Sequence, residues 1–185
     1  MPEINGFLSL LDSRSFTTVW FWVLLILSWS VTGRGVLGVP GDVIARARRE
    51  PEGEPGLLLL DWLSLSLPRW RLGPREGAVL LGVGLFVITS LGVLGFLYGL
   101  EMAQALVLLM APFGIILLLR LRLARQLSPM IDAARAGETP PDQVTLTALR
   151  KMVVHRRMFT MASILTITVT AFWAARWAVL HPHGL

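Results

Sequence analysis

Cysteine is absent from this chain of 185 residues. Its absence excludes disulfide bonds, thiolate metal sites, cysteine-held iron–sulfur clusters and cysteine nucleophiles. Charge is scarce as well, because Asp, Glu, Lys and Arg make up 16% of the residues, against about 25% in an average soluble domain. The sequence patterns of P-loop nucleotide-binding proteins, α/β-hydrolases and HExxH zinc proteases do not occur. We therefore expect a protein that is not an enzyme, with no catalytic residue, no cofactor and no metal site.

Long uncharged runs dominate what is present, and hydrophobic residues make up 54% of the chain. Four segments approach or exceed the length of about 20 apolar residues that crosses a bilayer. Backbone polar groups in lipid must pair within their own segment, which requires helices. We therefore predict an all-α membrane protein in which residues 1–185 form a single four-span domain. The four transmembrane helices cover about residues 15–33, 77–98, 102–122 and 157–178.

The second and third spans come from one run, residues 77–119, whose 43 residues carry a single charge at Glu101. As one helix this run would be about 65 Å long, roughly twice the thickness of the hydrocarbon core. Three glycines mark the break, and the last of them, Gly99, suits a helix C-cap. The run therefore predicts two helices joined by a tight hairpin around residues 98–102.

Basic residues gather in two of the segments between the spans. Residues 34–76 hold seven arginines, and residues 120–157 hold eight basic residues. Short loops rich in Lys and Arg stay in the cytoplasm, so the loops 34–76 and 123–156 are predicted to be cytoplasmic and both termini to face out. This is the expected topology of a multi-pass protein in a bacterial inner membrane.

The positive charge of these two loops also predicts which molecules the protein contacts. It favours anionic lipid headgroups and other membrane or cytoplasmic protein subunits over nucleic acid. The candidate partner or lipid contacts are Arg46, Arg48, Arg49, Arg156 and Arg157.

The first cytoplasmic loop is expected to have structure of its own. VIARARR, residues 43–49, predicts a short basic helix, and EPEGEPG, residues 50–56, predicts a flexible acidic link. Residues 57–70 fit an amphipathic helix at the membrane surface, and their alternating leucines also permit a short extended piece. The side chains that such a helix would turn toward lipid or protein are Leu58, Leu59, Trp62 and Leu63.

The second cytoplasmic loop carries a helix signal as well. Ser128 suits an N-cap, Pro129 a first helical position and Gly137 a stop, which predicts a separate helix over residues 128–137. Asp142 can cap a further helix that enters the fourth span.

Glu101 has two interpretations. A carboxylate within the membrane can relay protons or bind a cation. Alternatively, Glu101 lies in the first turn of the third span, where it meets the positive end of the helix dipole and keeps its water at the interface. Gln104 lies three residues on and shares its face of the helix. The length of the two helices favours the second interpretation.

Polar residues elsewhere also leave alternatives open. Thr166 and Thr170 belong to a stripe at near-helical spacing in the fourth span, which fits a packing face and also the lining of a path. His155, between basic residues, predicts a solvated or headgroup-facing side chain. His181 and His183 could join Glu101 in holding a metal, although a chain end seldom supplies fixed ligands.

Three stretches resemble a family of small bacterial inner-membrane proteins that are often labelled "component of SufBCD complex". They are DSRSFTTVWFWVLLILSWS (12–30), VLGVPGDVIARARR (36–49) and LGFLYGLEMAQALVLLMAPFG (94–114). The resemblance covers roughly the first two thirds of the chain. It implies a membrane partner of the iron–sulfur assembly machinery and carries no site residue.

Two functions from different classes follow. The first is a non-enzymatic accessory or assembly subunit that docks partners through its basic cytoplasmic face. The alternative is a small oligomeric transporter or channel that uses Glu101, Gln104, Thr166 and Thr170. An integral-membrane enzyme acting on lipid ranks third.

Overall fold

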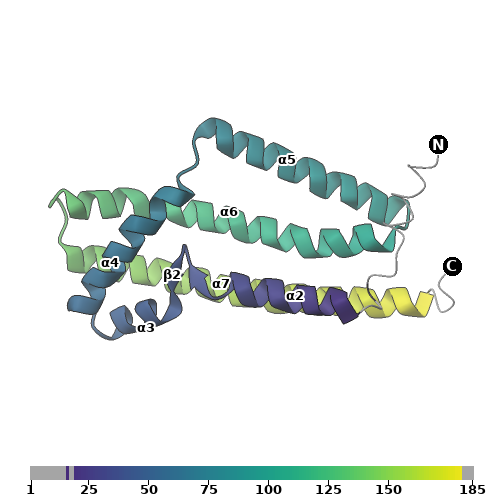
Figure 1. The fold of residues 1–185 in the computed structure, drawn as a ribbon, viewed down its shortest axis with the longest axis horizontal. Helices are drawn as coiled ribbons and strands as arrows, with labels where there is room; N and C mark the ends of the chain where they lie inside the picture. The colour runs from purple at the N-terminus through teal and green to yellow at the C-terminus, as the bar shows by residue number, and fades with distance from the viewer. Residues whose placement is uncertain (1–15, 17–18, 181–185) are drawn as a thin grey trace. The chain divides into compact units, whose positions relative to one another are not determined.

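The computed structural model describes Phe16 and residues 19–180, and it is mostly helical (Figure 1). This confirms the all-α class. In chain order the elements are α2 (Val19–Thr32), β1 (Gly35–Val36), β2 (Val39–Pro40), α3 (Gly41–Arg49), α4 (Glu54–Ser66), the 3₁₀ helix η1 (Leu67–Trp70), α5 (Pro74–Gly92), the π-helix η2 (Val93–Leu97), α6 (Glu101–Arg135) and α7 (Pro141–Leu180).

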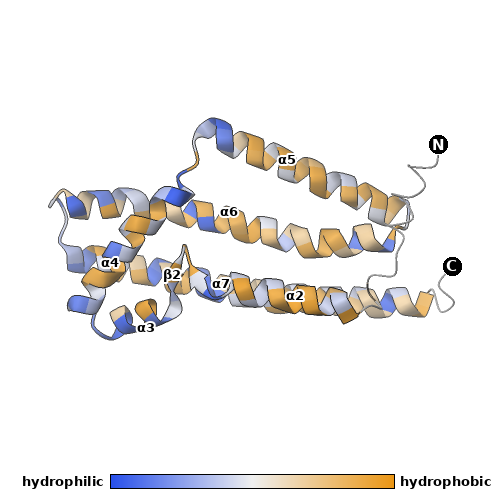
Figure 2. Ribbon diagram, viewed as in Figure 1, coloured by the Kyte–Doolittle hydropathy of each residue, from blue (hydrophilic) through white to orange (hydrophobic). Residues whose placement is uncertain are grey.

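Three helices are long and apolar enough to cross a membrane, namely Pro74–Leu97, Glu101–Arg135 and Pro141–Leu180. The helix α5 has no buried side chain, and apolar residues occupy most of its length (Figure 2). Such extensive exposed apolar surface is typical of a helix surrounded by lipid. The apolar helix α2 has 14 residues, about 21 Å at 1.5 Å per residue. Part of the first predicted span, residues 15–33, falls outside the described residues.

The run 77–119 breaks where its glycines predict. The α-helix α5 gives way to η2, the chain turns at Gly99 with a φ of +74°, and α6 begins at Glu101. A positive φ is easily adopted only by glycine. A Cβ at Gly95 would lie 2.7 Å from the backbone nitrogen of Gln104, so this glycine permits close contact between η2 and α6. The prediction of two helices and a tight connection is confirmed.

One predicted boundary is wrong. No separate helix starts at Ser128, because α6 continues without interruption through Pro129 to Arg135. Leu127 and Ile131 are buried, and their packing outweighs the hydrogen bond that Pro129 cannot donate. The predicted stop is confirmed, since Gly137 has a φ of +74° directly after the helix.

The chain forms two compact units. One consists of Met1–Trp29, Gly77–Ile115 and Ala162–Leu185, and the other of Ser30–Glu76 and Ile116–Met161. We call the second the loop unit, because it holds both predicted cytoplasmic loops. The loop unit has a hydrophobic core to which β1, β2, α3, α4, α6 and α7 all contribute, so these loops are a folded body rather than mere connections. Its least exposed side chains include Leu37, Leu59, Leu63, Leu127 and Met152.

A β-hairpin starts the loop unit and was missed in the sequence. Val36 pairs with Val39, and the two turn residues Leu37 and Gly38 have φ values of +56° and +89°. Positive φ at both positions matches a type I′ turn, in which leucine is uncommon. Leu37 is fully buried, and this burial offsets the strain of its backbone. Residues 33–38, GRGVLG, also have the spacing GxGxxG, but they form this turn rather than the strand-to-helix turn of a dinucleotide site.

The loop segments 43–49 and 57–70 are helical, as expected. The first belongs to α3, and the second forms most of α4 together with η1, which excludes the extended alternative. Leu59 and Leu63 enter the core of the loop unit, whereas Leu58 and Trp62 lie on the exposed side. The predicted flexible link is shorter than expected, because α4 already begins at Glu54.

Candidate functional site

The carboxylate of Glu101 accepts two hydrogen bonds at the start of α6. Its Oε1 accepts the backbone N–H of Phe16 at 2.6 Å, and its Oε2 accepts the indole N–H of Trp177 at 3.1 Å. Glu101 is 5% exposed. Its predicted place in the first turn is confirmed, but the expectation that it keeps its water is wrong. Two protein donors take the place of that water, and the helix dipole adds to their effect.

Gln104 forms a second set of hydrogen bonds one turn further along α6. Its Nε2 donates to the carbonyl oxygen of Gly95 at 2.8 Å, and its Oε1 accepts the indole N–H of Trp173 at 2.9 Å. Gln104 is 3% exposed. We call Glu101, Gln104, Trp173 and Trp177 the hairpin cluster. It connects α6 with α7, η2 and Phe16.

Each side-chain acceptor oxygen of the hairpin cluster already accepts a hydrogen bond from the protein. Both oxygens of Glu101 and the oxygen of Gln104 receive donors from other parts of the same unit. A buried network that is satisfied in this way holds a fold in place and is costly to break. The sequence marked Glu101 and Gln104 but did not reveal that two tryptophans of α7 are their donors.

Thr166 and Thr170 of the threonine stripe both lie on α7, in the part of the chain that the structure describes. Thr170 is fully buried, and its hydroxyl has no partner in that part of the chain. Thr166 is half-buried on the same helix. Both positions fit the packing interpretation, in which small side chains allow close approach.

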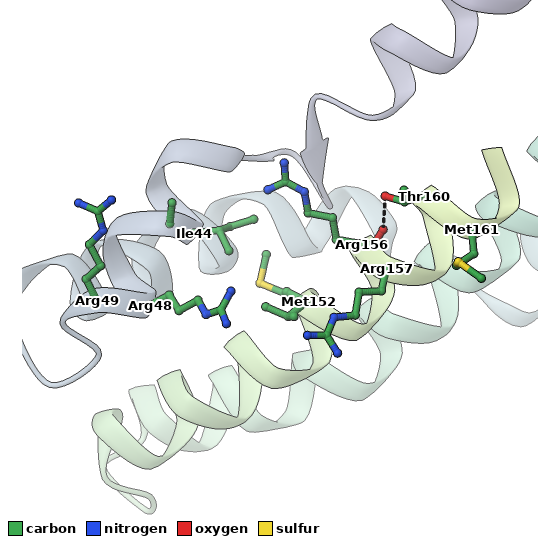
Figure 3. A pocket seen from close by; sticks show the side chains of 10 residues that line it. Ile44, Arg48, Arg49, Met152, Arg156, Arg157, Thr160 and Met161 are labelled. Atoms are coloured by element: carbon green, nitrogen blue, oxygen red, sulfur yellow. Dashed lines mark hydrogen bonds between the residues drawn. The ribbon is translucent and has the colours of Figure 1, made fainter. Parts of the chain in front are cut away.

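A second feature lies in the loop unit, where a groove of about 870 Å³ separates α3 from α7 (Figure 3). Four of the five candidate arginines line it. Arg48 and Arg49 come from α3, and Arg156 and Arg157 come from α7. We call it the arginine groove. It brings together two arginine pairs that are more than 100 residues apart in the sequence.

The periodicity of the two helices explains this meeting. On α3, Val43, Ile44 and Ala47 are buried, which leaves the arginines of its last turn exposed. On α7, Met152 and His155 are buried, and the two arginines that follow are exposed. Core packing of the apolar faces therefore fixes where the charged faces lie.

Arg46 is the candidate arginine that does not line the groove. Its guanidinium lies 2.8 Å from the carboxylate of Asp42, one turn earlier on α3. Within the described residues, none of the four arginines of the groove forms an ion pair with a carboxylate. A Cβ placed on Gly41 would be 3.6 Å from a guanidinium nitrogen of Arg156, so the start of α3 packs closely against this side chain.

The expectation of a solvated or headgroup-facing His155 is wrong, because this side chain is 6% exposed and lies within the loop unit. Burial, and secondly the positive charge of Arg120, lower the pKa of this imidazole. The neutral form is therefore favoured at pH 7, and His155 adds no charge to the groove beside it.

His181 and His183 lie outside the described residues. In the part of the chain that the structure describes, no group of three or more His, Cys, Asp or Glu side chains is placed to hold a metal ion.

No protein-family model, curated protein or solved structure matches this chain.

Proposed function

We propose that this protein is a non-enzymatic accessory or assembly subunit of a bacterial inner membrane that docks partners through its basic face. The observation that carries the proposal is the arginine groove, with four arginines from two helices and no carboxylate among its lining residues. Unpaired guanidinium groups retain their full capacity for bidentate bonds to carboxylates or phosphates. The folded core of the loop unit supplies a rigid support for them.

We further propose four spans with both termini outside. The distribution of charge supports this topology, because 15 of the 17 basic residues fall within 34–76 and 120–157. The loop unit is then cytoplasmic, and the hairpin at Gly99 faces out. A connection to iron–sulfur assembly is part of the proposal and has its support in the resemblance alone.

The alternative of a transporter or channel requires free polar groups along a path. Glu101 and Gln104 are engaged in the hairpin cluster, which favours the accessory role. Liposome flux separates the two functions. Flux that disappears in Glu101→Gln while the variant remains folded would favour the conduit.

Co-purification tests the accessory role. The protein, extracted in mild detergent, should bring down a stoichiometric protein partner, and Arg48→Glu with Arg157→Glu should release it. The matched control is Arg135→Glu with Arg150→Glu, which reverses two exposed charges outside the groove. If no stoichiometric partner is found, or if both double variants behave alike, the proposed function is wrong.

A further inference from the structure

The arginine groove combines two chemistries in one cavity. Its cations are Arg48, Arg49, Arg156 and Arg157, and its apolar side chains are Ile44, Ala45, Met152, Val153 and Met161. A free inorganic anion would use the guanidinium groups and leave the exposed apolar side chains, Met161 above all, in contact with water. An amphiphile with an anionic head and a hydrocarbon tail would satisfy both.

The order of the lining residues along α7 matches such a ligand. Arg156 directly precedes the fourth predicted span, 157–178, and Arg157 is its first residue. In the proposed topology both therefore lie at the level of lipid headgroups. Met161 lies about 6 Å further along the helix axis from Arg157, and it is 70% exposed. From Arg157 to Met161 the lining therefore changes from cationic to apolar in the direction in which a membrane changes from headgroups to acyl chains, whereas Met152 and Val153 lie on the other side of the two arginines.

Flexible apolar side chains suit acyl chains as well. Methionine fills irregular space and adapts to ligands without fixed shape. Met161 offers such a side chain at the surface of the groove, whereas Met152 is buried beneath it in the core. A volume of about 870 Å³ holds a headgroup and the first part of its chains.

We propose that the arginine groove binds one anionic phospholipid, with its phosphate between the arginine pairs of α3 and α7 and its acyl chains over Met161. This lipid site rests on the proposed function in one respect, namely that the groove lies on the cytoplasmic face of the membrane.

The experiment uses the full chain, purified and delipidated in a zwitterionic detergent with no partner protein present. Isothermal titration calorimetry measures binding of dioctanoyl phosphatidylglycerol, dioctanoyl phosphatidylcholine and inorganic phosphate. We expect one bound phosphatidylglycerol per chain, much weaker binding of the zwitterionic lipid, and no competition from phosphate at equal concentration.

Two double variants test the position of the site. Arg48→Gln with Arg156→Gln removes one cation from each side of the groove, and Arg46→Gln with Arg150→Gln removes the same charge from the same two helices outside it. The groove variant should bind phosphatidylglycerol about a hundredfold more weakly than the control, because it removes two charge-assisted hydrogen bonds and each contributes roughly tenfold. All four arginines are exposed, and circular dichroism checks that both variants remain folded.

Three results would overturn the lipid site. The first is equal affinity of the two double variants for phosphatidylglycerol. The second is binding of inorganic phosphate as tight as that of the lipid, which would indicate a simple anion site. The third comes from the separate co-purification experiment: if the groove variant loses a protein partner there while its lipid binding stays unchanged, the groove belongs to that partner. Lipid binding without any stoichiometric protein partner would defeat the proposed function and leave the lipid site standing.

Discussion

Glu101 illustrates how the surroundings of one residue decide its role. Along the sequence it is a lone charge in a run of apolar residues, which suggests ion or proton chemistry. In the fold it accepts hydrogen bonds from Phe16 and Trp177 and lies where the positive end of α6 points. Both carboxylate oxygens are therefore occupied by donors of the same chain. A carboxylate held in this way is suited to fixing a connection rather than to moving a proton.

The first prediction concerns the loss of this charge. Glu101→Gln presents one oxygen and one amide group to two N–H donors, so one donor faces another donor. We expect a loss of about 1–3 kcal/mol in the free energy of unfolding, because a buried polar group loses its partner. Unfolding of the protein in detergent, followed by circular dichroism, measures the change.

A double-mutant cycle shows whether Trp177 is the affected donor. In a Trp177→Phe background the conflict is removed, and Glu101→Gln should cost clearly less than in the natural chain. Trp20→Phe is the control, since Trp20 is exposed on α2 and should add its effect independently. Additive effects of Glu101→Gln and Trp177→Phe would contradict the bond on which the hairpin cluster depends.

At the scale of the elements, the glycines of α5 and η2 have different roles that the sequence does not distinguish. A Cβ at Gly95 would meet the backbone of α6, whereas a Cβ at Gly84 would meet nothing within 4 Å. Only tertiary contact separates the two positions, because both lie in one continuous apolar run.

The second prediction uses this pair. Gly95→Ala should destabilise the protein by about 1–3 kcal/mol, because the added methyl group separates two tightly packed backbones. Gly84→Ala should leave stability unchanged or raise it slightly, since alanine favours a helix over glycine. Thermal unfolding of both variants in the same detergent provides the measurement. Equal effects of the two substitutions would show that η2 and α6 are not in close contact.

Elements set by local chemistry were predictable from the sequence, and elements set by packing were not. Gly99 and Gly137 stop helices because their positive φ excludes most other residues. Ser128, by contrast, has every local feature of an N-cap and still lies inside α6, because its neighbours are held in the core of the loop unit. The turn at Leu37 also escaped prediction, since leucine at positive φ depends on burial that only the folded unit supplies.

At the scale of the whole molecule, charge and hydropathy divide the chain in a way that the sequence shows directly. The candidate arginines could be chosen from sequence, because basic clusters beside apolar runs indicate contact with lipid or partners. Their assembly into a groove could not, since it depends on how α3 and α7 pack on a shared core. The same packing leaves Arg46 outside the groove, where it pairs with Asp42 one helical turn away.

The third prediction tests the topology, and the absence of cysteine provides a clean background for it. Tyr98→Cys introduces a thiol at the exposed connection between α5 and α6, and Glu138→Cys introduces one at the exposed connection between α6 and α7. A maleimide that cannot cross membranes should label Tyr98→Cys on intact cells and Glu138→Cys only after permeabilisation, with the natural chain unlabelled throughout. The reason is that basic residues flank Glu138 in the sequence whereas the hairpin at Tyr98 has none, and the membrane retains basic loops in the cytoplasm. If Glu138→Cys reacted on intact cells, the arginine groove would face away from the cytoplasm, and neither docking of a cytoplasmic partner nor contact with the anionic cytoplasmic leaflet could be its role.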